Sequence, residues 1–308
     1  GSTSRGLMIT DFSGRGVDVS SSGNVVAGNY IGTDGIANLG NAQAGVYFQS
    51  TASNNMVGGT TAADGNVIAY SGWDGIRING TGTGNAFLGN RIYGNAEQGI
   101  DIGAQGVTLN DAGDGDTGSN DLQNFPVLAA AGTDGSTIAV SGSLNTTANT
   151  TMRLEFFANA SGDATGYGEG QTLLGSTTVV TDGSGNASYV VSFAKAVSAG
   201  QLVSATATVI GASGYGSTSE FAFNVAATGA LIIDTTADIV DGNTTSISNL
   251  LANKGADGKI SLREAILATN NTAGHDTIFL PTGTYTLSIA GANENASATG
   301  DLDIIQSL

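Results

Sequence analysis

Residues 16–19 read Gly-Val-Asp-Val, and the phrase returns as Gly-Val-Tyr-Phe at 45–48, Gly-Ile-Arg-Ile at 75–78 and Gly-Ile-Asp-Ile at 99–102. Each copy is a glycine followed by the inward, outward and inward positions of a short strand. A repeat of this length is typical of a solenoid, because each turn buries only a small inner face and needs neighbours above and below it. The sequence therefore predicts an all-β protein whose residues 1–125 form a right-handed parallel β-helix.

A second phrase, built on asparagine, lies between these copies. It occurs at 23–26, 54–57, 65–68, 84–87 and 89–92. Asparagine tolerates left-handed backbone, and its amide can bond from one turn of a solenoid to the next. These phrases are therefore interpreted as corners of the coil and not as active residues.

The composition supports a β-rich extracellular protein. Of 308 residues, 48 are glycine, 2 are proline and none is cysteine. A net charge of −17 disfavours nucleic acid and anionic membranes and suits calcium. No apolar run is long enough to insert into a membrane, and we expect any export signal to lie outside this fragment. We expect the protein to be secreted or held at the cell surface.

The hydrophobic period changes over residues 126–228. Longer stretches with two-residue alternation predict strands at 137–143, 151–158, 171–180, 186–193, 201–210 and 217–225. Six or seven such strands in about 100 residues are typical of an immunoglobulin-like β-sandwich. Nothing in this region gathers a nucleophile, a base and an acid.

Residues 229–308 begin with a short strand and contain one helical signal. Ser261 and Glu264 form a capping box, in which the two side chains satisfy amides of the first helical turn reciprocally. Leu262, Ala265 and Ile266 would line one face of the helix that follows. The sequence predicts this short α-helix as the only one in the chain.

The same region carries a resemblance to a known family. The motif Asp-Gly-Lys-Ile-Ser-Leu-Arg-Glu-Ala-Ile at 257–266 is followed by Asp-Thr-Ile-Phe-Leu-Pro-Thr-Gly-Thr-Tyr-Thr-Leu at 276–287 and Gly-Asp-Leu-Asp-Ile at 300–304. It resembles the CSLREA-type segment that opens parallel β-helices in large bacterial surface proteins, with Ile260 in place of the family's cysteine. The coils around 55–68 are also similar to that family's. The resemblance implies that residues 229–308 are a cap and first coil, and that the chain is one register of a tandem array.

Two groups of residues are predicted to hold calcium as a structural cofactor. Asp111, Asp114, Asp116 and Asn120 lie in an acidic, glycine-rich stretch that offers oxygens at close intervals, although a polar linker is the alternative. The run from Asn253 to Glu264 has the spacing of an EF-hand loop and places Asp257 fifth and Glu264 twelfth. Its ligand set is thin, and a capping box alone is the alternative reading.

No catalytic residue is predicted, and we expect the chain not to be an enzyme. Asp18, Tyr47, Arg77 and Asp101 would form one outward column, but the two aspartates are three turns apart, too far to act on one bond. Arg77 is more simply a cross-turn partner of Asp101. The single histidine, His275, is interpreted as a solvated turn residue.

Two functions of different classes remain open. The first is a structural repeat of an extracellular bacterial fibre, stalk or adhesin, which meets copies of itself or neighbouring tandem repeats head to tail. The second is a β-helix protein that binds or cleaves a surface polysaccharide, supported by fold analogy alone. The residues predicted to form the assembly interface are Leu7, Ile9, Val17, Val19, Tyr285, Leu287, Leu302 and Ile304.

Overall fold

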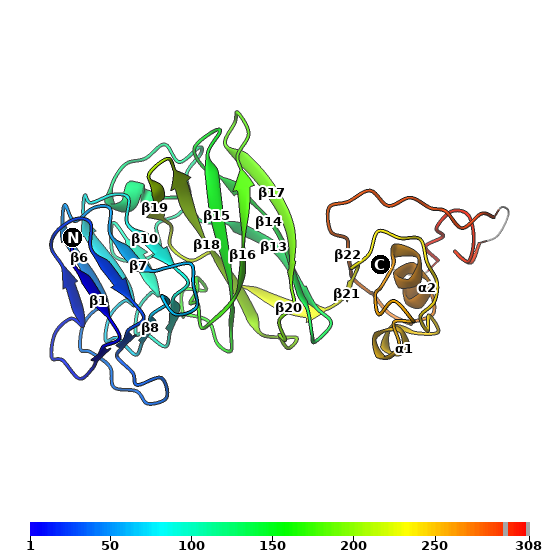
Figure 1. Ribbon diagram of the computed structural model, residues 1–308, viewed down its shortest axis with the longest axis horizontal. Helices are drawn as coiled ribbons and strands as arrows, with labels where there is room; N and C mark the ends of the chain where they lie inside the picture. The colour runs from blue at the N-terminus through cyan, green and yellow to red at the C-terminus, as the bar shows by residue number, and fades with distance from the viewer. Residues whose placement is uncertain (292–294, 306–308) are drawn as a thin grey trace. The chain divides into compact units, whose positions relative to one another are not determined.

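The computed structural model describes residues 1–291 and 295–305 (Figure 1). It is an all-β structure with two short α-helices in these residues. The chain divides into two compact units, which are described separately. The first contains Gly1–Ala129, Gly142–Tyr189 and Gln201–Ala226, and the second contains Ala130–Ser141, Val190–Gly200 and Ala227–Leu308.

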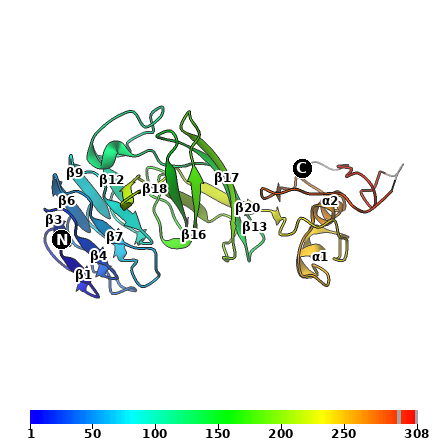
Figure 2. The same cartoon turned by 45° about the horizontal axis from the view of Figure 1, so that its top comes forward.

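Residues 1–102 form short strands that visit three parallel sheets in rotation (Figure 2). β1, β4, β7 and β10 form one sheet, β2, β5, β8 and β11 the second, and β3, β6, β9 and β12 the third. The chain therefore makes four turns of three strands each, and these stacked parallel sheets fit a β-helix. The strands are β1 (Thr3–Arg5), β2 (Met8–Ile9), β3 (Val17–Val19), β4 (Val25–Ala27), β5 (Tyr30–Ile31), β6 (Val46–Ser50), β7 (Met56–Gly58), β8 (Val67–Ala69), β9 (Ile76–Gly80), β10 (Ala86–Leu88), β11 (Arg91–Tyr93) and β12 (Ile100–Ile102).

The repeated glycine phrase sets the register of the third sheet. Val17 pairs with Val46, Val46 with Ile76, and Ile76 with Ile100, so equivalent residues of successive phrases lie directly over one another. Ile76 and Ile100, which begin β9 and β12, are at most 2% exposed. The predicted inward positions are confirmed, and each turn contributes a layer of apolar side chains to one continuous core.

Two columns of asparagine side chains run along the stack. The side-chain oxygen of Asn55 accepts hydrogen bonds from the backbone N–H and the amide of Asn24, at 2.8 and 3.0 Å. The oxygen of Asn85 accepts the same pair of bonds from Asn55. A second column contains Asn29, Asn66 and Asn90. The predicted amide ladder is confirmed, and it satisfies buried amides at the corners of the coil.

The corners differ from the prediction in their backbone. Among the asparagines of the Gly-Asn phrases, Asn54 has left-handed backbone, with a φ of 55°. At the other left-handed corners the residue is the glycine, as at Gly23 and Gly84, whose φ values are 74° and 70°. Glycine adopts this conformation without a steric penalty, and the next residue then keeps its amide free for the ladder.

Residues 127–229 form a second, mostly antiparallel sheet, with strand order β16-β15-β18-β20-β13-β14-β17 and β19 paired to β18. The rings of Phe156 in β15 and Tyr189 in β17 lie 5.4 Å apart, although these strands are far apart in the order. The sheet therefore curls so that strands from its two ends face each other across a core. The strands are β13 (Val127–Thr133), β14 (Ile138–Asn145), β15 (Thr151–Asn159), β16 (Thr172–Val180), β17 (Asn186–Phe193), β18 (Leu202–Gly211), β19 (Gly214–Thr218) and β20 (Val225–Gly229).

One predicted strand of this region is wrong. Residues 217–225 do not form a continuous strand, because β19 ends at Thr218 and β20 begins at Val225. Glu220 and Phe221, which lie between them, are 1% and 2% exposed. This segment is buried because it covers the last turn of the coil stack, as described below.

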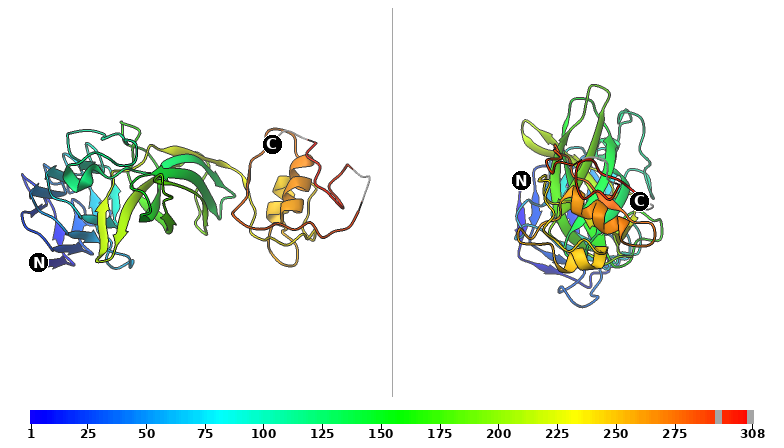
Figure 3. Two further views of the ribbon diagram at one scale, coloured as in Figure 1. Left: turned by 90° about the horizontal axis from the view of Figure 1, so that it is seen from above. Right: turned by 90° about the vertical axis from the view of Figure 1, so that its right-hand side faces the viewer.

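The C-terminal part contains β21 (Leu231–Ile232), α1 (Ile247–Ala252), α2 (Leu262–Asn270) and β22 (Ile278–Phe279). Figure 3 shows the two helices in contact with each other. The capping box of Ser261 and Glu264 is confirmed. The prediction of a single helix is wrong, because Ser246 also caps a helix by accepting the N–H of Asn249 at 3.2 Å.

Two segments expected to continue a solenoid do not form strands. Residues 284–289 and 302–305 have no regular structure in the structure described. The backbone N–H groups of Ser288 and Ile289 donate to Asp238, and that of Ile305 donates to Asn270. A solenoid strand gains most of its hydrogen bonds from adjacent turns, and no such turn lies beside these segments in the described chain. None of the described helices is long and apolar enough to cross a membrane.

Candidate functional site

The last turn of the coil stack is closed by residues that follow it in the chain, and we call this the closed end. Three glutamates from the curled sheet of residues 127–229 and its loops accept backbone N–H groups of this turn. The pairs are Gly89 with Glu155 at 2.8 Å, Asn95 with Glu169 at 3.3 Å, and Ile102 with Glu220 at 3.0 Å. The last turn would otherwise expose backbone N–H groups without acceptors, and side chains of the same chain accept them instead.

Burial changes the acid–base behaviour of these glutamates. It raises the pKa of Glu169 to about 7 and that of Glu220 to about 7, although hydrogen bonds from Asn95, Ile102 and Thr108 act in the opposite direction. Burial also raises the pKa of Glu155, against the hydrogen bond from Gly89 and the charge of Arg153. The closed end therefore contains carboxyl groups that titrate near neutral pH.

The apolar core is closed at the same end. Phe157 and Phe221, from outside the coils, belong to the same buried cluster as Ile92 and Ile102 of the last turn. Their rings contact each other edge to face at 5.4 Å. Because neither phenylalanine is more than 3% exposed, the inner face of the last turn is covered and not available for a further coil.

The opposite end of the stack is open, and we call it the open end. β1, β2 and β3 each pair with one strand only, on the side of the next turn. Leu7, Met8 and Phe12 beside them are 50%, 62% and 54% exposed. Of the predicted interface residues here, Leu7 is exposed, Ile9 and Val17 are half-buried and Val19 is buried.

The predicted interface residues of the C-terminal part lie outside regular strands. Leu287 and Ile304 are 44% and 56% exposed. Leu302 is half-buried, and Tyr285 packs against the helices with its hydroxyl donating to the Pro281 carbonyl at 3.0 Å. This segment therefore carries exposed apolar side chains without a strand partner among the described residues.

The predicted column of the third sheet is present, but most of it is not solvent-exposed. Asp18, Tyr47, Arg77 and Asp101 are in register, and Arg77 forms an ion pair with Asp101, as predicted. Tyr47 is 8% exposed and Asp101 is 1% exposed. The loop after β12 contributes to this cover, because Gly106 donates its N–H to Asp101 at 3.1 Å.

Two adjoining hollows lie beside this column. The first, of about 340 Å³, is lined by Tyr47, Trp73, Asp74, Asn79 and Glu97, and we call it the Trp73 hollow. The second, of about 260 Å³, is lined by residues that include Asp101, and we call it the Asp101 hollow. Asp74, Glu97 and Gln105 line both hollows.

The sequence interpretation did not identify Asp74 and Glu97 as site residues. Trp73 and Asp74 precede the glycine of one phrase, and Glu97 and Gln98 hold the same two positions one turn later. Gln98 donates its backbone N–H to Asp74 at 3.1 Å, so these positions do stack. Extending the register two residues upstream of each glycine would have brought them together.

The three aspartates of the predicted calcium loop do lie together. Asp111, Asp114 and Asp116 each offer a carboxylate oxygen within 4.8 Å of the others. Burial, together with the neighbouring aspartates, raises the pKa of Asp114 and that of Asp116. Asp111 and Asp114 already accept hydrogen bonds from Gly115, Asn124 and Thr146. The oxygens of the three aspartates would therefore supply only part of the six to eight oxygen ligands that calcium prefers. Calcium binding here stays a prediction.

Asn120 does not join these aspartates as a ligand. Its side-chain oxygen accepts the Asn85 N–H, and its amide donates to the carbonyls of Asn85 and Thr218. The side chain is completely buried in the asparagine column, because it occupies the place that the next turn would fill.

The EF-hand reading of residues 253–264 finds little support in the geometry. Both oxygens of Glu264 are engaged, one by the N–H groups of Asp241 and Gly242 and the other by that of Ser261. Asp257 is exposed and accepts the N–H of Lys259. The arrangement is that of a helix cap in which Glu264 also holds a preceding loop.

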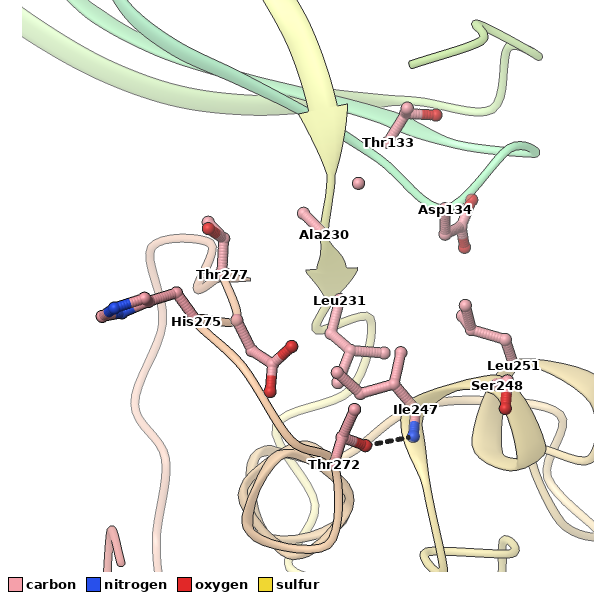
Figure 4. Close-up of a pocket in the computed structure, with 12 residues that line it drawn as sticks. Thr133, Asp134, Ala230, Leu231, Ile247, Ser248, Leu251, Thr272, His275 and Thr277 are labelled. Atoms are coloured by element: carbon pink, nitrogen blue, oxygen red, sulfur yellow. Dashed lines mark hydrogen bonds between the residues drawn. The ribbon is translucent and has the colours of Figure 1, made fainter. Parts of the chain in front are cut away.

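A further hollow of about 430 Å³ lies in the second unit, beside α1 (Figure 4). Leu231, Ile247 and Leu251 give it an apolar wall, and the ring of His275 points away from Leu231. Thr272 accepts the Ile247 N–H at 2.9 Å, which is a bond within the fold. The described side chains here offer no paired nucleophile and base.

Comparison with known proteins leaves the family open. The chain matches no protein-family model and no curated protein sequence. The resemblance to CSLREA-type segments therefore stays a prediction.

Proposed function

We propose that this chain is a non-catalytic structural repeat of an extracellular bacterial fibre, stalk or adhesin. In this proposal the coil stack is a right-handed β-helix, the curled sheet is an immunoglobulin-like sandwich, and residues 229–308 are a CSLREA-like cap. The contact of Phe156 in β15 with Tyr189 in β17, strands that lie far apart in the sheet order, supports the sandwich assignment. The partner is a second copy of the chain or a neighbouring tandem repeat.

The observation that carries the proposal is the difference between the two ends of the coil stack. The closed end is covered by Glu155, Glu169, Glu220 and Phe221, whereas the open end exposes the free edges of β1, β2 and β3. A free parallel edge bordered by apolar side chains is a template for another strand. The two ends of the stack therefore differ, because one is satisfied within the chain and the other presents strand edges that a partner could pair with.

The segment that would meet this edge is the C-terminal one. Leu287, Ile304 and Ile305 are 44%, 56% and 60% exposed, and the sequence around Thr284–Ile289 alternates as a strand does. An open end on one copy and a C-terminal segment on another are different surfaces, so their contact is heterologous. Contacts of this kind propagate into an open filament unless the rotation closes a ring.

The test uses two blocked variants. Met8→Asp with Phe12→Asp blocks the open end, and Ile304→Asp with Ile305→Asp blocks the C-terminal segment. Sedimentation velocity at increasing concentration should show filaments for the wild-type chain and monomers for each blocked variant. An equimolar mixture of the two should give a dimer and nothing larger, because each variant keeps one competent surface.

Ile36→Asp is the matched control. Ile36 is 90% exposed in the loop between β5 and β6, so its replacement removes surface apolar area from neither β1–β3 nor the C-terminal segment. It should assemble as the wild type does. A wild-type chain that stays monomeric at high concentration, or a mixture that forms no dimer, would contradict the proposal.

A further inference from the structure

The Trp73 hollow has the size and lining of a ligand site. Its volume of about 340 Å³ falls within the roughly 300–1,000 Å³ of typical small-molecule pockets. Trp73 is 39% exposed at its rim, while Tyr47 forms a wall with its hydroxyl fixed by the Asn79 amide at 2.9 Å. A rigid aromatic wall and an accessible indole together offer an apolar platform beside hydrogen-bonding groups.

The charges around the two hollows are unbalanced. Asp74, Glu97 and Asp101 line them together with one cationic side chain, Arg77, while Arg15 stacks on the Tyr47 ring at 3.4 Å and pairs with Asp18. Arg77 is committed to Asp101, and it lies 3.6 Å from Asp74. Asp163, in a loop after β15, adds a fourth carboxylate at the edge of the Asp101 hollow. The excess negative charge favours a cationic ligand and disfavours an acidic one such as a uronic acid.

Buried acceptors of these hollows lack partners. Among the described side chains, Asp101 Oδ1 and Gln98 Oε1 are buried and accept no hydrogen bond, although both residues line the Asp101 hollow. The two residues are 1% and 4% exposed. A buried acceptor without a donor is unfavourable, so these oxygens indicate that a donor-rich group completes the site.

Neighbouring contacts hold the lining in place. Gln105 donates its amide to Glu97 at 2.9 Å, and this bond connects the loop after β12 to the segment between β11 and β12. Glu97 in turn donates its backbone N–H to the Trp73 carbonyl. The aromatic and acidic parts of the site are therefore fixed to each other across successive turns of the coil.

We propose that the joined Trp73 and Asp101 hollows bind a glucosamine unit of a cationic amino-sugar polymer. The pyranose ring would lie against Trp73, its ammonium group would face Asp74 and Glu97, and its hydroxyls would face the amide side chains of Asn79 and Gln105. An aromatic face next to carboxylates attracts ammonium groups through cation–π and charge interactions. A bare metal ion is disfavoured, because these carboxylates do not form a cluster of three within 4.8 Å of one another, as the described Asp111 group does.

This inference goes beyond the proposed structural role, and the two can fail separately. The site lies on the flank of the coil stack, on residues that belong to neither the open end nor the C-terminal segment. Trp73→Ala should therefore weaken sugar binding and leave filament formation in sedimentation unchanged. A protein that assembles but binds no sugar would contradict only the inference made here.

The probes are three matched hexasaccharides: a glucosamine hexamer, its fully N-acetylated form and cellohexaose. Calorimetric titration of the full chain at pH 7 and low salt should show binding of the glucosamine hexamer, at least tenfold tighter than of the other two. Trp73→Ala and Glu97→Gln should each weaken it at least tenfold. Tyr30→Ala, which removes an aromatic side chain that is 44% exposed on another sheet, should not.

Melting curves of the variants separate lost binding from lost folding, because a loss of affinity is attributed to the site only in a variant that melts at the wild-type temperature. Raising the salt to 0.5 M should weaken the interaction, because exposed charges are screened within a few ångström at that concentration. Equal affinity for the three hexasaccharides would overturn the proposal. So would hexalysine binding as tightly as the glucosamine hexamer with no effect of Trp73→Ala, because the site would then recognise charge alone.

Discussion

The side-chain oxygen of Asn120 accepts the backbone N–H of Asn85 at 2.8 Å, and the Asn120 amide donates back to the Asn85 carbonyl at 2.9 Å. Asn120 thereby continues the column of Asn24, Asn55 and Asn85 although it belongs to no coil. Replacing Asn120 with alanine should leave buried backbone groups of the last turn without partners. We expect a loss of roughly 2–3 kcal/mol in the free energy of unfolding of the first unit, measured by urea denaturation.

Asn24→Ala is the control for this prediction. It removes the first member of the same column, at the open end, where water can replace the lost hydrogen bonds. Its cost should stay below about 1 kcal/mol. Equal losses for the two variants would show that the closed end is no more dependent on its asparagine than the open end.

The buried glutamates of the closed end predict a stability that depends on pH. The pKa of Glu169 and that of Glu220 are about 7 in the folded chain, above the ordinary value of about 4.5. The folded state therefore binds more protons than the unfolded state between these values. Their contribution is fully present below about pH 4.5 and is lost as the pH rises through 7, on the order of 3 kcal/mol for each group.

The double variant Glu169→Gln and Glu220→Gln tests this linkage. It keeps an oxygen for the N–H of Asn95 and one for that of Ile102, leaves the Thr108 N–H without its Glu220 oxygen, and removes the titration. The denaturant concentration at the unfolding midpoint of the wild type should decrease as the pH is raised from 5 to 8. In the double variant this decrease should be smaller, so the variant should be the more stable protein at pH 8. Asp18→Asn, at an exposed position in β3 outside the closed end, should keep the wild-type slope. A midpoint that rises with pH to the same extent in wild type and double variant would contradict the assignment.

The cluster of Asp111, Asp114 and Asp116 should stabilise the protein when calcium is bound and destabilise it when calcium is removed. Addition of EDTA should lower the melting temperature of the wild type and increase proteolytic nicking within residues 110–125. Changing all three to asparagine should remove both effects. In EDTA this variant should melt above the wild type, because it lacks the repulsion between close carboxylates. Melting and nicking that are unchanged by EDTA would remove calcium from this loop.

The sequence predicted those parts of the fold that depend on local repetition. Equivalent residues such as Val17 and Val46 lie one turn apart, so the spacing of the glycine phrase translated directly into sheet register. The Ser261–Glu264 capping box was equally readable, because all of its partners lie within four residues. Repeats and short-range capping interactions can be recognised in a sequence without knowledge of the contacts between distant segments.

The parts that were missed depend on contacts between distant segments. Glu155 and Glu220 look like ordinary surface carboxylates in an alternating strand, yet they are buried because they meet the last turn of the coil. The same contact breaks the strand predicted at 217–225. Asp74 and Glu97 come together only through the stacking of turns, and both lie outside the repeated four-residue phrase.

Phe221 provides the last prediction, which concerns the apolar part of the closed end. It is 2% exposed and packs edge to face on Phe157 over the isoleucines of the last turn. Phe221→Ala should leave a cavity at the mouth of the coil core and cost about 3–5 kcal/mol of unfolding free energy.

Phe223→Ala is the matched control, since it makes the same chemical change two residues away. Phe223 is 55% exposed and contacts Tyr167 edge to face at 5.2 Å, so its loss should cost only about 1 kcal/mol. The Phe221 variant should also show faster hydrogen exchange in β10, β11 and β12 than in β4 and β5, because the damage lies next to the last turn. Exchange that rises equally in all turns, or equal costs for the two phenylalanines, would mean that Phe221 is not what closes the core at this end.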